Sequence, residues 1–290
     1  MISLKPEVLV GPGRGLRFGE SPRWRGDRLW FIDIHDCAIK SVSLSGDLRT
    51  EIALPFKPNG LGFRSDGAVV FSDALKLRMY SWRGGRLDPI ADLSDQAVFC
   101  LSDAIVDGRD RTFVSDIGYN FWIPEAEPSD SCVIARIDPG GGVAKVAEGL
   151  RFPNGLVITP DGKTLIIAET DGGCLTAFDL TAEGGLSNRR VYAELPEGVR
   201  PDGICLDAEG AIWVANPAGG PAVLRVREGG AVTDRIELDS NAYAVMLGGA
   251  DGRRLFICAS ASHDPAEIAA NPSATLLVCD VTVPSAHASR

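Results

Sequence analysis

The six residues PNGLVI at 153–158 return in closely similar form as PNGLGF at 58–63 and PDGICL at 201–206. Looser copies are LSDAIV at 101–106 and GESPRW at 19–24. The lead residues of the five copies are 39, 43, 52 and 48 positions apart, and they are Glu20, Asn59, Ser102, Asn154 and Asp202. A sixth copy is expected 43 residues later, near Val245. Dividing 290 residues by six gives about 48, so the chain is built from six repeats of roughly that length.

Between the repeated phrases lie tight turns and short apolar, β-branched or aromatic runs, whose lengths suit strands. The runs are LWFI at 29–32, VVF at 69–71, TFV at 112–114, LII at 165–167, IWV at 212–214 and LFI at 255–257. Only Asp264–Asn271 and the stretch around Asp92–Gln96 have a helical pattern. A repeat of this length is typical of a four-stranded propeller blade. We therefore predict an all-β, six-bladed β-propeller, because a β-sandwich would not repeat one phrase six times in register.

The two ends of the chain each contain a strand-like run. These are Glu7–Val10 and Thr275–Val281. Pairing them in one blade would remove the exposed edges of an open ring, so we expect the N- and C-terminal strands to close that blade. No linker interrupts the repeats, and residues 1–290 are therefore predicted to form a single domain.

Composition narrows the range of partners. The chain has 29 Lys and Arg against 39 Asp and Glu, a net charge of −10, and no basic run, so neither nucleic acid nor an anionic membrane is expected as a partner. No apolar stretch approaches the ~20 residues that cross a bilayer, and the start of the chain has no export signal pattern. Seven scattered cysteines without a Cys-x-x-Cys pair indicate buried thiols in a reducing compartment. We expect a cytoplasmic protein whose oligomeric state the sequence does not indicate.

The lead residues predict a metal centre. The first strand of each propeller blade lines the central channel, so residues one repeat apart meet there. Unpaired carboxylates are costly to bury, and a divalent cation would neutralise Glu20 and Asp202. Oxygen donors without His or Cys suit a hard ion such as Ca²⁺, Mg²⁺ or Mn²⁺. The alternative is that Asn-Gly and Asp-Gly are ordinary turn formers. Turn formation does not explain why Glu20 occupies the corresponding position in the first repeat.

A second acidic series follows the second strand of successive repeats. It consists of Asp33, Asp73, Asp116, Glu169 and, in the fifth repeat, Asn216. These side chains either surround the pocket or cap strand ends on a solvated face. We favour capping, with Asp116 and Glu169 as the exceptions.

Four phrases together resemble the regucalcin/gluconolactonase family, namely GESPRW at 19–24, FPNG at 152–155, LSNRR at 186–190 and PDGICLDAEG at 201–210. The similarity extends over nearly the whole chain. It implies a six-bladed propeller with one catalytic divalent ion and activity on lactones of sugar acids. The family's metal ligands fall on Glu20, Asn154 and Asp202. The expected cofactor is Ca²⁺ first, with Zn²⁺, Mn²⁺ or Mg²⁺ as alternatives.

The third repeat departs from the family pattern at two substrate positions. Ser102 stands where many members have Asn, and Cys100 replaces an Arg that holds the sugar in some members. Ser102 lacks an amide donor and Cys100 cannot form a bidentate contact. Nearby aromatic residues point to a more apolar or aromatic substrate, with blade packing as the alternative for each of Phe99, Tyr119, Phe121 and Trp122. The predicted substrate-binding residues are Asn59, Ser102, Asp103, Cys100, Tyr119, His35 and His263. For the two histidines, simple loop exposure is the alternative.

These observations predict a metal-dependent lactonase, a carboxylic ester hydrolase that opens a sugar-acid lactone or a more apolar one. Asp202 is the candidate general base and Glu20 the second catalytic carboxylate. A serine-hydrolase mechanism has no support because the chain contains no Gly-x-Ser-x-Gly. Two alternatives stay open: a propeller enzyme of different chemistry, such as phosphotriester hydrolysis or condensation and cyclisation, and a non-catalytic binding propeller.

Overall fold

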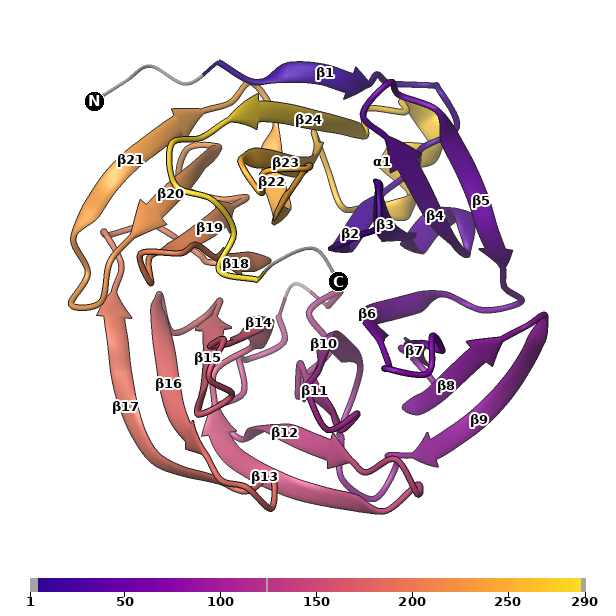
Figure 1. Cartoon of the computed structure of the whole chain (residues 1–290), viewed down its shortest axis with the longest axis vertical. Coiled ribbons are helices and arrows are strands. Elements are labelled where there is room, and N and C mark those ends of the chain that lie inside the picture. Colours follow the sequence, from indigo (N-terminus) through magenta and orange to yellow (C-terminus); the bar gives the residue numbers. More distant parts are fainter. Residues whose placement is uncertain (1–4, 124, 288–290) are drawn as a thin grey trace.

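The computed structural model of the protein describes residues 5–123 and 125–287. Within these residues, 24 strands form six four-stranded antiparallel sheets. The sheets stand around a common centre as the blades of a propeller (Figure 1). The prediction of an all-β, six-bladed β-propeller is therefore confirmed.

The strands of each blade follow one another from the centre to the rim. The first blade contains β2 (Gly19–Arg25), β3 (Arg28–Asp33), β4 (Ala38–Ser43) and β5 (Leu48–Ala53). The second contains β6 (Pro58–Phe63), β7 (Val69–Asp73), β8 (Arg78–Arg83) and β9 (Arg86–Asp92). The third contains β10 (Leu101–Val106), β11 (Thr112–Asp116), β12 (Cys132–Ile137) and β13 (Val143–Leu150). The fourth and fifth contain β14 (Pro153–Ile158), β15 (Thr164–Glu169), β16 (Cys174–Leu180) and β17 (Leu186–Glu194); and β18 (Ile204–Leu206), β19 (Ile212–Asn216), β20 (Ala222–Val226) and β21 (Val232–Glu237). The sixth contains β22 (Asn241–Gly248), β23 (Arg254–Ser260), β24 (Thr275–Asp280) and β1 (Glu7–Val10).

The sixth blade closes the ring with strands from both ends of the chain. β1 pairs antiparallel with β24, with Glu7 opposite Val278 and Val8 opposite Leu277. In Figure 1 the indigo strand β1 lies along the outer side of the yellow strand β24. This pairing confirms the predicted closure and covers the edge of β24 that an open ring would expose.

One of the two helical predictions is right. Helix α1 (Pro265–Ala270) begins after Asp264, whose side chain accepts hydrogen bonds from the backbone N–H groups of Ala266 and Glu267 at 2.8 and 3.0 Å. The stretch at Asp92–Gln96 is instead a turn at the end of β9. There the Asp92 carboxylate accepts hydrogen bonds from the N–H and hydroxyl of Ser94 at 3.1 and 2.7 Å, an arrangement that favours a turn over a continuing helix.

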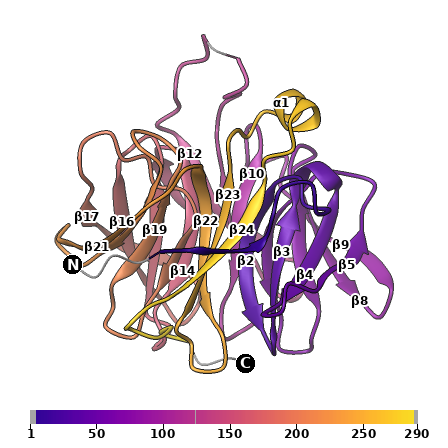
Figure 2. The same cartoon turned by 90° about the horizontal axis from the view of Figure 1, so that it is seen from above.

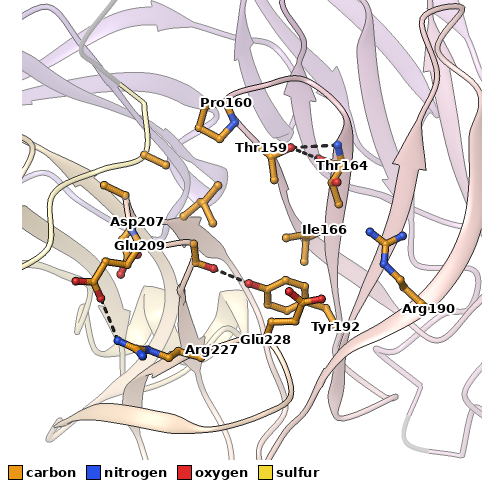
Figure 3. Close-up of a pocket in the computed structure, with 14 residues that line it drawn as sticks. Thr159, Pro160, Thr164, Ile166, Arg190, Tyr192, Asp207, Glu209, Arg227 and Glu228 are labelled. Carbon is orange, nitrogen blue, oxygen red and sulfur yellow. Dashed lines mark hydrogen bonds and ion pairs between the residues drawn. The ribbon is translucent and has the colours of Figure 1, made fainter.

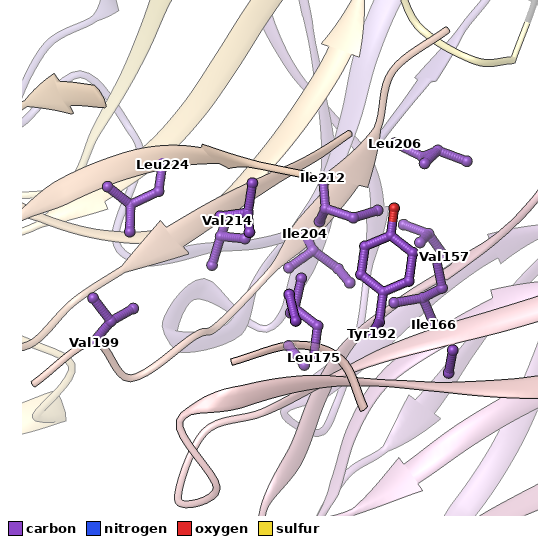
Figure 4. Packing of buried hydrophobic residues seen from close by; sticks show 14 of the residues in the cluster. Val157, Ile166, Leu175, Tyr192, Val199, Ile204, Leu206, Ile212, Val214 and Leu224 are labelled. Atoms are coloured by element: carbon purple, nitrogen blue, oxygen red, sulfur yellow. The ribbon is translucent and has the colours of Figure 1, made fainter. Parts of the chain in front are cut away.

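The core lies between the blades, where the alternating apolar residues of neighbouring sheets face each other. Figure 4 shows the cluster between the fourth and fifth blades. Its members include Val157, Ile166 and Leu175 from one blade and Ile204, Ile212, Val214 and Leu224 from the other. Burying a side chain of this size stabilises the fold by roughly 1.5–3 kcal/mol. The clusters between blades therefore hold neighbouring blades, and with them their inner strands, in fixed positions relative to one another.

The ring has two different faces. We call the face at which the inner strands β2, β6, β10, β14, β18 and β22 begin the upper face. Helix α1 and the long loop between β11 and β12 project from this face, whereas the chain leaves β24 towards the opposite, lower face (Figure 2). Loops that connect second to third strands also lie on the upper face, so the lead residues, the long loop and α1 share one end of the channel.

All seven cysteines are free thiols, and five of them are buried. Cys37 and Cys174 are only partly buried. The expectation of buried thiols is therefore right for five of the seven cysteines. No helix in residues 5–123 and 125–287 has the length and apolar character needed to cross a membrane.

Candidate metal centre and substrate site

The inner strands contact one another around the whole channel. At the lead position the contact is direct, because the Gly155 N–H donates to the carbonyl oxygen of Asp202 at 3.3 Å and the Gly203 N–H donates to that of Tyr243 at 2.8 Å. The lead residues therefore converge as predicted. These bonds also make Tyr243 the sixth lead residue. Val245 is two residues further along β22, buried against the core of the fifth and sixth blades, so that assignment was wrong.

The glycine that follows Asn59, Asn154 and Asp202 explains the repeated phrase in those three blades. A Cβ atom on Gly155 would lie 2.6 Å from the backbone nitrogen of Ile204, and one on Gly203 would lie 2.7 Å from the Cα of Ala244. These distances are too short for any side chain. Asn154 and its glycine belong to the inner strand β14 rather than to a turn. The glycines therefore permit close contact between inner strands, and the turn-former interpretation is wrong for this phrase.

Two carboxylates meet at the centre without a cationic partner. Asp202 is buried with 8% of its surface exposed, and Glu20 is partly buried. Burial raises the pKa of Glu20 to about 8, with a further contribution from the charge of Asp103. Burial, and then the charge of Glu20, raises the pKa of Asp202 well above its usual value. Neither carboxylate forms an ion pair with a Lys, Arg or His within the described residues.

Hydrogen bonds hold the Asn154 amide beside the two carboxylates. Its Oδ1 accepts from the Ser102 hydroxyl at 3.3 Å, and its Nδ2 donates to the Thr170 Oγ1 at 3.4 Å. The Thr170 hydroxyl in turn donates to the carbonyl oxygen of Pro201 at 2.6 Å. Ser102 and Thr170 are both buried. They orient the amide, with Oδ1 turned to Ser102.

The central donor set fits a hard divalent cation. Glu20 and Asp202 supply two uncompensated negative charges, and Asn154 supplies an amide oxygen, which are the ligands that Ca²⁺ and Mg²⁺ prefer. Zn²⁺ fits less well because no His or Cys belongs to the set. In the described part of the chain, no group of three or more His, Cys, Asp or Glu side chains is placed to hold a metal ion. A site here therefore depends on the amide as its third ligand.

Below this level the channel is closed by an ion pair. Arg23 Nη2 lies 2.9 Å from Asp103 Oδ1 and 3.2 Å from Oδ2, and it also donates to the carbonyl oxygen of Ala104 at 2.6 Å. Both charged side chains are largely buried. Arg23 and Asp103 line a space, together with Glu20 and Asn154, that is too narrow to hold a water molecule.

The two histidines predicted for the pocket lie together on the upper face. His35 Nε2 is 3.1 Å from the carbonyl oxygen of His263, so Nε2 carries the proton and donates. His35 Nδ1 is consequently an acceptor, and it is buried without a hydrogen-bond partner. Burial lowers the pKa of His35, which keeps the ring neutral near pH 7. His263 is exposed, and its ring lies 6.3 Å from that of Tyr243.

The model of the SMP-30/gluconolactonase/LRE-like family matches residues 18–261. The chain belongs to this family. Among relatives, zebrafish (Danio rerio) regucalcin is 27% identical over 78% of this chain and 76% of its own. The 6-deoxy-6-sulfogluconolactonase of Pseudomonas putida is 26% identical over 86% of this chain and 85% of its own.

The fold is shared with solved structures. That of a calcium-binding protein, regucalcin, from Agrobacterium tumefaciens superposes with a TM-score of 0.80, at 24% identity, over 99% of this chain and 97% of its own. At this identity the likeness shows the propeller fold. The family match over residues 18–261 confirms the resemblance to the regucalcin/gluconolactonase family.

Cys100 and Asn59, two of the predicted substrate-binding residues, form hydrogen bonds within the protein. Cys100 is buried, and its thiol lies 3.5 Å from the carbonyl oxygen of Leu101. Burial, with the charge of Asp116 adding to it, raises the pKa of the Cys100 thiol to about 12, so it is not a reactive thiolate. Asn59 Nδ2 donates to the same Leu101 oxygen at 3.3 Å, while its Oδ1 accepts from the Gly60 N–H.

Tyr119 belongs to a polar cluster on the upper face that the sequence did not reveal. Its hydroxyl donates to Asp171 Oδ2 at 2.7 Å, and Arg200 pairs with the other oxygen of the same carboxylate. Burial and the bond to Asp171 raise the pKa of Tyr119 above its usual value. These residues come from three separate loops, so only the fold brings them together. Arg200 stands two residues before the lead residue Asp202, but no repeated residue in the other blades marks its position as functional.

The second acidic series is structural. Asp33 Oδ1 accepts from the Phe18 N–H at 2.9 Å, and Glu169 Oε2 accepts from the Arg151 N–H at 2.8 Å. The equivalent bonds link Phe99 to Asp116 and Arg200 to Asn216, at 3.3 and 2.9 Å. Each bond fixes the loop that leads to an inner strand. The capping interpretation holds for the bonds, also at Asp116 and Glu169. The expected solvated face is wrong because all five side chains are buried, and Asp73 accepts instead from the Lys76 N–H at 3.3 Å.

A larger cavity of about 860 Å³ lies at the lower face between the fourth and fifth blades. Figure 3 shows that Thr159 and Pro160 follow β14, Asp207 and Glu209 follow β18, and Tyr192 comes from the outer strand β17. The Tyr192 hydroxyl donates to the carbonyl oxygen of Gly210 at 2.5 Å. Arg227 pairs with Glu209 there. No lead residue lines this cavity. Size alone therefore does not make it the site of the family's chemistry.

Proposed function

We propose that this protein hydrolyses a lactone with the help of a divalent cation held by Glu20, Asn154 and Asp202. The observation that carries the proposal is the pair of central carboxylates without a cationic partner, in a chain of a family whose members include named lactonases. Two carboxyl groups with raised pKa values at the centre of the channel favour a functional site there over a purely structural role. Ca²⁺ is the proposed ion because the donors are oxygen atoms.

A divalent ion at this position would polarise the lactone carbonyl and favour deprotonation of water. Asp202 is the proposed general base. As the water oxygen bonds to the carbonyl carbon, Asp202 accepts one of its protons. The ring C–O bond then breaks, and the proton passes to the alkoxide that leaves, which yields a hydroxy acid. Glu20, fixed by the Ser21 N–H at 3.1 Å, supplies the second negative charge of the site.

Ser102 and Thr170 are proposed to act through Asn154. Their hydrogen bonds hold the amide in one orientation, which is the role of residues that surround the ligands of a metal site. Tyr119, His35 and His263 are proposed to contact the substrate from the upper face. Asn59, Cys100 and Asp103 have internal partners and are proposed to shape the pocket around it.

Hydrolysis of a lactone panel tests the proposal. Sugar-derived, aliphatic and aromatic lactones would be assayed before and after chelation, and again after Ca²⁺, Mg²⁺, Mn²⁺ or Zn²⁺ is restored. We expect turnover of at least one lactone that disappears with the chelator and returns with a metal. Turnover that survives complete removal of metal would rule out the metal-dependent mechanism, and failure of every lactone would point to other chemistry on this scaffold.

The cellular setting is also a proposal. The seven free thiols suit a reducing compartment, so we propose the cytoplasm. The net charge of −10 leads us to propose a small-molecule substrate without nucleic-acid or membrane partners. We propose that the six blades act as one domain.

A further inference from the structure

A continuous set of aromatic rings leads from the central carboxylates to the surface of the upper face. It begins with Tyr243, the lead residue of the sixth blade, whose hydroxyl pKa is raised to about 12 by burial and further by the charges of Asp202 and Glu20. The Phe18 ring packs edge-on against Tyr243, with centroids 4.8 Å apart. His263 follows at 6.3 Å from Tyr243.

From His263 the set continues to the opposite side of the ring. The Trp122 and Phe121 rings of the long loop between β11 and β12 lie 5.6 and 6.4 Å from His263. Phe152, directly before β14, lies 5.7 Å from Phe121. Loops of the first, third, fourth and sixth blades thus meet above the carboxylates. We call Phe18, Tyr243, His263, Phe121, Trp122 and Phe152 the aromatic wall.

Exposed apolar side chains also occur on the upper face, in the long loop that carries this wall and in loops of the second and third blades. Trp122 and Ile123 are 41% and 50% exposed, and Leu75 and Val98 on neighbouring upper-face loops are 54% and 67% exposed. These are four of the eight large hydrophobic residues that are exposed in the described residues. Scattered single residues of this kind are ordinary, whereas a group at the opening of a site indicates an apolar ligand.

Three of the polar side chains predicted to bind substrate are occupied by internal bonds. Both ends of the Asn59 amide are bonded, the Ser102 hydroxyl donates to Asn154, and Asp103 is paired with Arg23. Releasing any of them for a ligand would cost the bond that it already makes. The site therefore presents its aromatic rings to a substrate more freely than these three groups, and His35 Nδ1 is an acceptor that stays without a partner among the described residues.

We infer that the substrate is a lactone that carries an apolar alkyl or aryl substituent, with the lactone ring at the central carboxylates and the substituent against the aromatic wall. This inference rests on the lactone hydrolysis proposed above and adds the substrate class. Phe121 and Trp122 are its specificity-determining residues. Each methylene group buried against the wall favours binding about fourfold, so two or three such groups predict a preference of roughly 15- to 60-fold.

Three six-membered lactones of the same ring chemistry test the inference. They are δ-valerolactone without a substituent, δ-decalactone with a pentyl chain, and glucono-1,5-lactone with hydroxyl groups. We expect kcat/KM to be highest for δ-decalactone, by at least tenfold over both others after spontaneous hydrolysis is subtracted. A preference for glucono-1,5-lactone would overturn the substrate class while leaving the lactonase proposal intact. Failure of all three, together with the wider panel, would overturn the lactonase proposal itself.

Two variants locate the preference. In Phe121→Ser and Trp122→Ala, kcat/KM for δ-decalactone should fall at least tenfold, and that for δ-valerolactone should fall by a much smaller factor. Val191→Ser is the matched control, because Val191 is 55% exposed on the outer strand β17 and far from the wall by its place in the blade. Thermal unfolding of each variant shows whether the fold is kept. An equal fall for both lactones in variants that keep their melting temperature would overturn the role of the wall in specificity.

Discussion

The guanidinium of Arg23 crosses from the first blade to the third, where its Nη2 lies 2.9 Å from Oδ1 of Asp103. The two residues are 80 positions apart in the chain. The pair places one positive charge beneath three carboxylates, since Asp103 acts on both Glu20 and Asp202. One cation against three anions leaves two negative charges, which is the charge that a divalent ion would neutralise.

Replacing Arg23 by Met should destabilise the protein by about 3–5 kcal/mol, because Asp103 would be left buried without its partner. Chemical denaturation of the metal-free variant and wild type measures this difference. The double variant Arg23→Met/Asp103→Asn removes both charges and should recover most of the loss. A single variant as stable as wild type would show that the pair does not stabilise the channel.

Replacing Asp202 by Asn should leave the propeller folded and reduce kcat by about 10²–10⁴-fold, which is the range for loss of a general base. Circular dichroism and steady-state kinetics at saturating metal separate folding from turnover. Asp239→Asn, at an exposed loop position after β21, is the control and should behave as wild type. Undiminished turnover in Asp202→Asn would refute its role as base.

The raised pKa of Glu20 predicts how the metal-free protein responds to pH. The pKa in the folded state is about 8, above the ordinary value of 4.5, so folding favours the protonated form. Stability is then fullest below about 4.5 and is lost as the pH rises towards 8. The melting temperature of chelated protein should therefore fall across this window more steeply than that of Glu20→Gln. Parallel curves for the two proteins would contradict the assignment.

Thr170 should matter for metal affinity although it is not a proposed ligand. In Thr170→Val the hydrogen bonds to Asn154 and Pro201 are lost while the size of the side chain is kept. Loss of such an orienting residue typically weakens metal binding 10–100-fold. Calorimetric titration with Ca²⁺ measures the affinity, and Thr233→Val in the fifth blade serves as the control. Equal affinities in all three proteins would show that Asn154 needs no such support.

Much of this architecture is predictable from the sequence because the repeated phrase carries its own physical reason. Gly155 and Gly203 stand where neighbouring inner strands touch, so their recurrence marks the inner strands and the lead residues beside them. The sixth blade lacks that phrase, with Tyr243 and Ala244 in place of Asn-Gly or Asp-Gly, and its lead residue was consequently misplaced by two positions.

Contacts between distant side chains could not be predicted in the same way. The Arg23–Asp103 pair and the cluster of Tyr119, Asp171 and Arg200 join side chains of different types that no repeated phrase marks as partners. The helical pattern at 92–96 failed for a local reason, because the Asp92 side chain competes for the backbone of the next residues. The spacing of the repeats therefore predicts where the strands lie, whereas the pairing of side chains depends on how the blades meet in the folded propeller.

A stoichiometric metal titration tests the central claim most directly. Chelated protein would be titrated with Ca²⁺ while calorimetry follows binding and the preferred lactone reports turnover in the same samples. The account predicts that turnover rises in step with binding and saturates at one ion per chain, and that Glu20→Gln and Asn154→Ala lose both together. Full turnover in the chelated protein, or one tightly bound ion that persists in both variants, would contradict it.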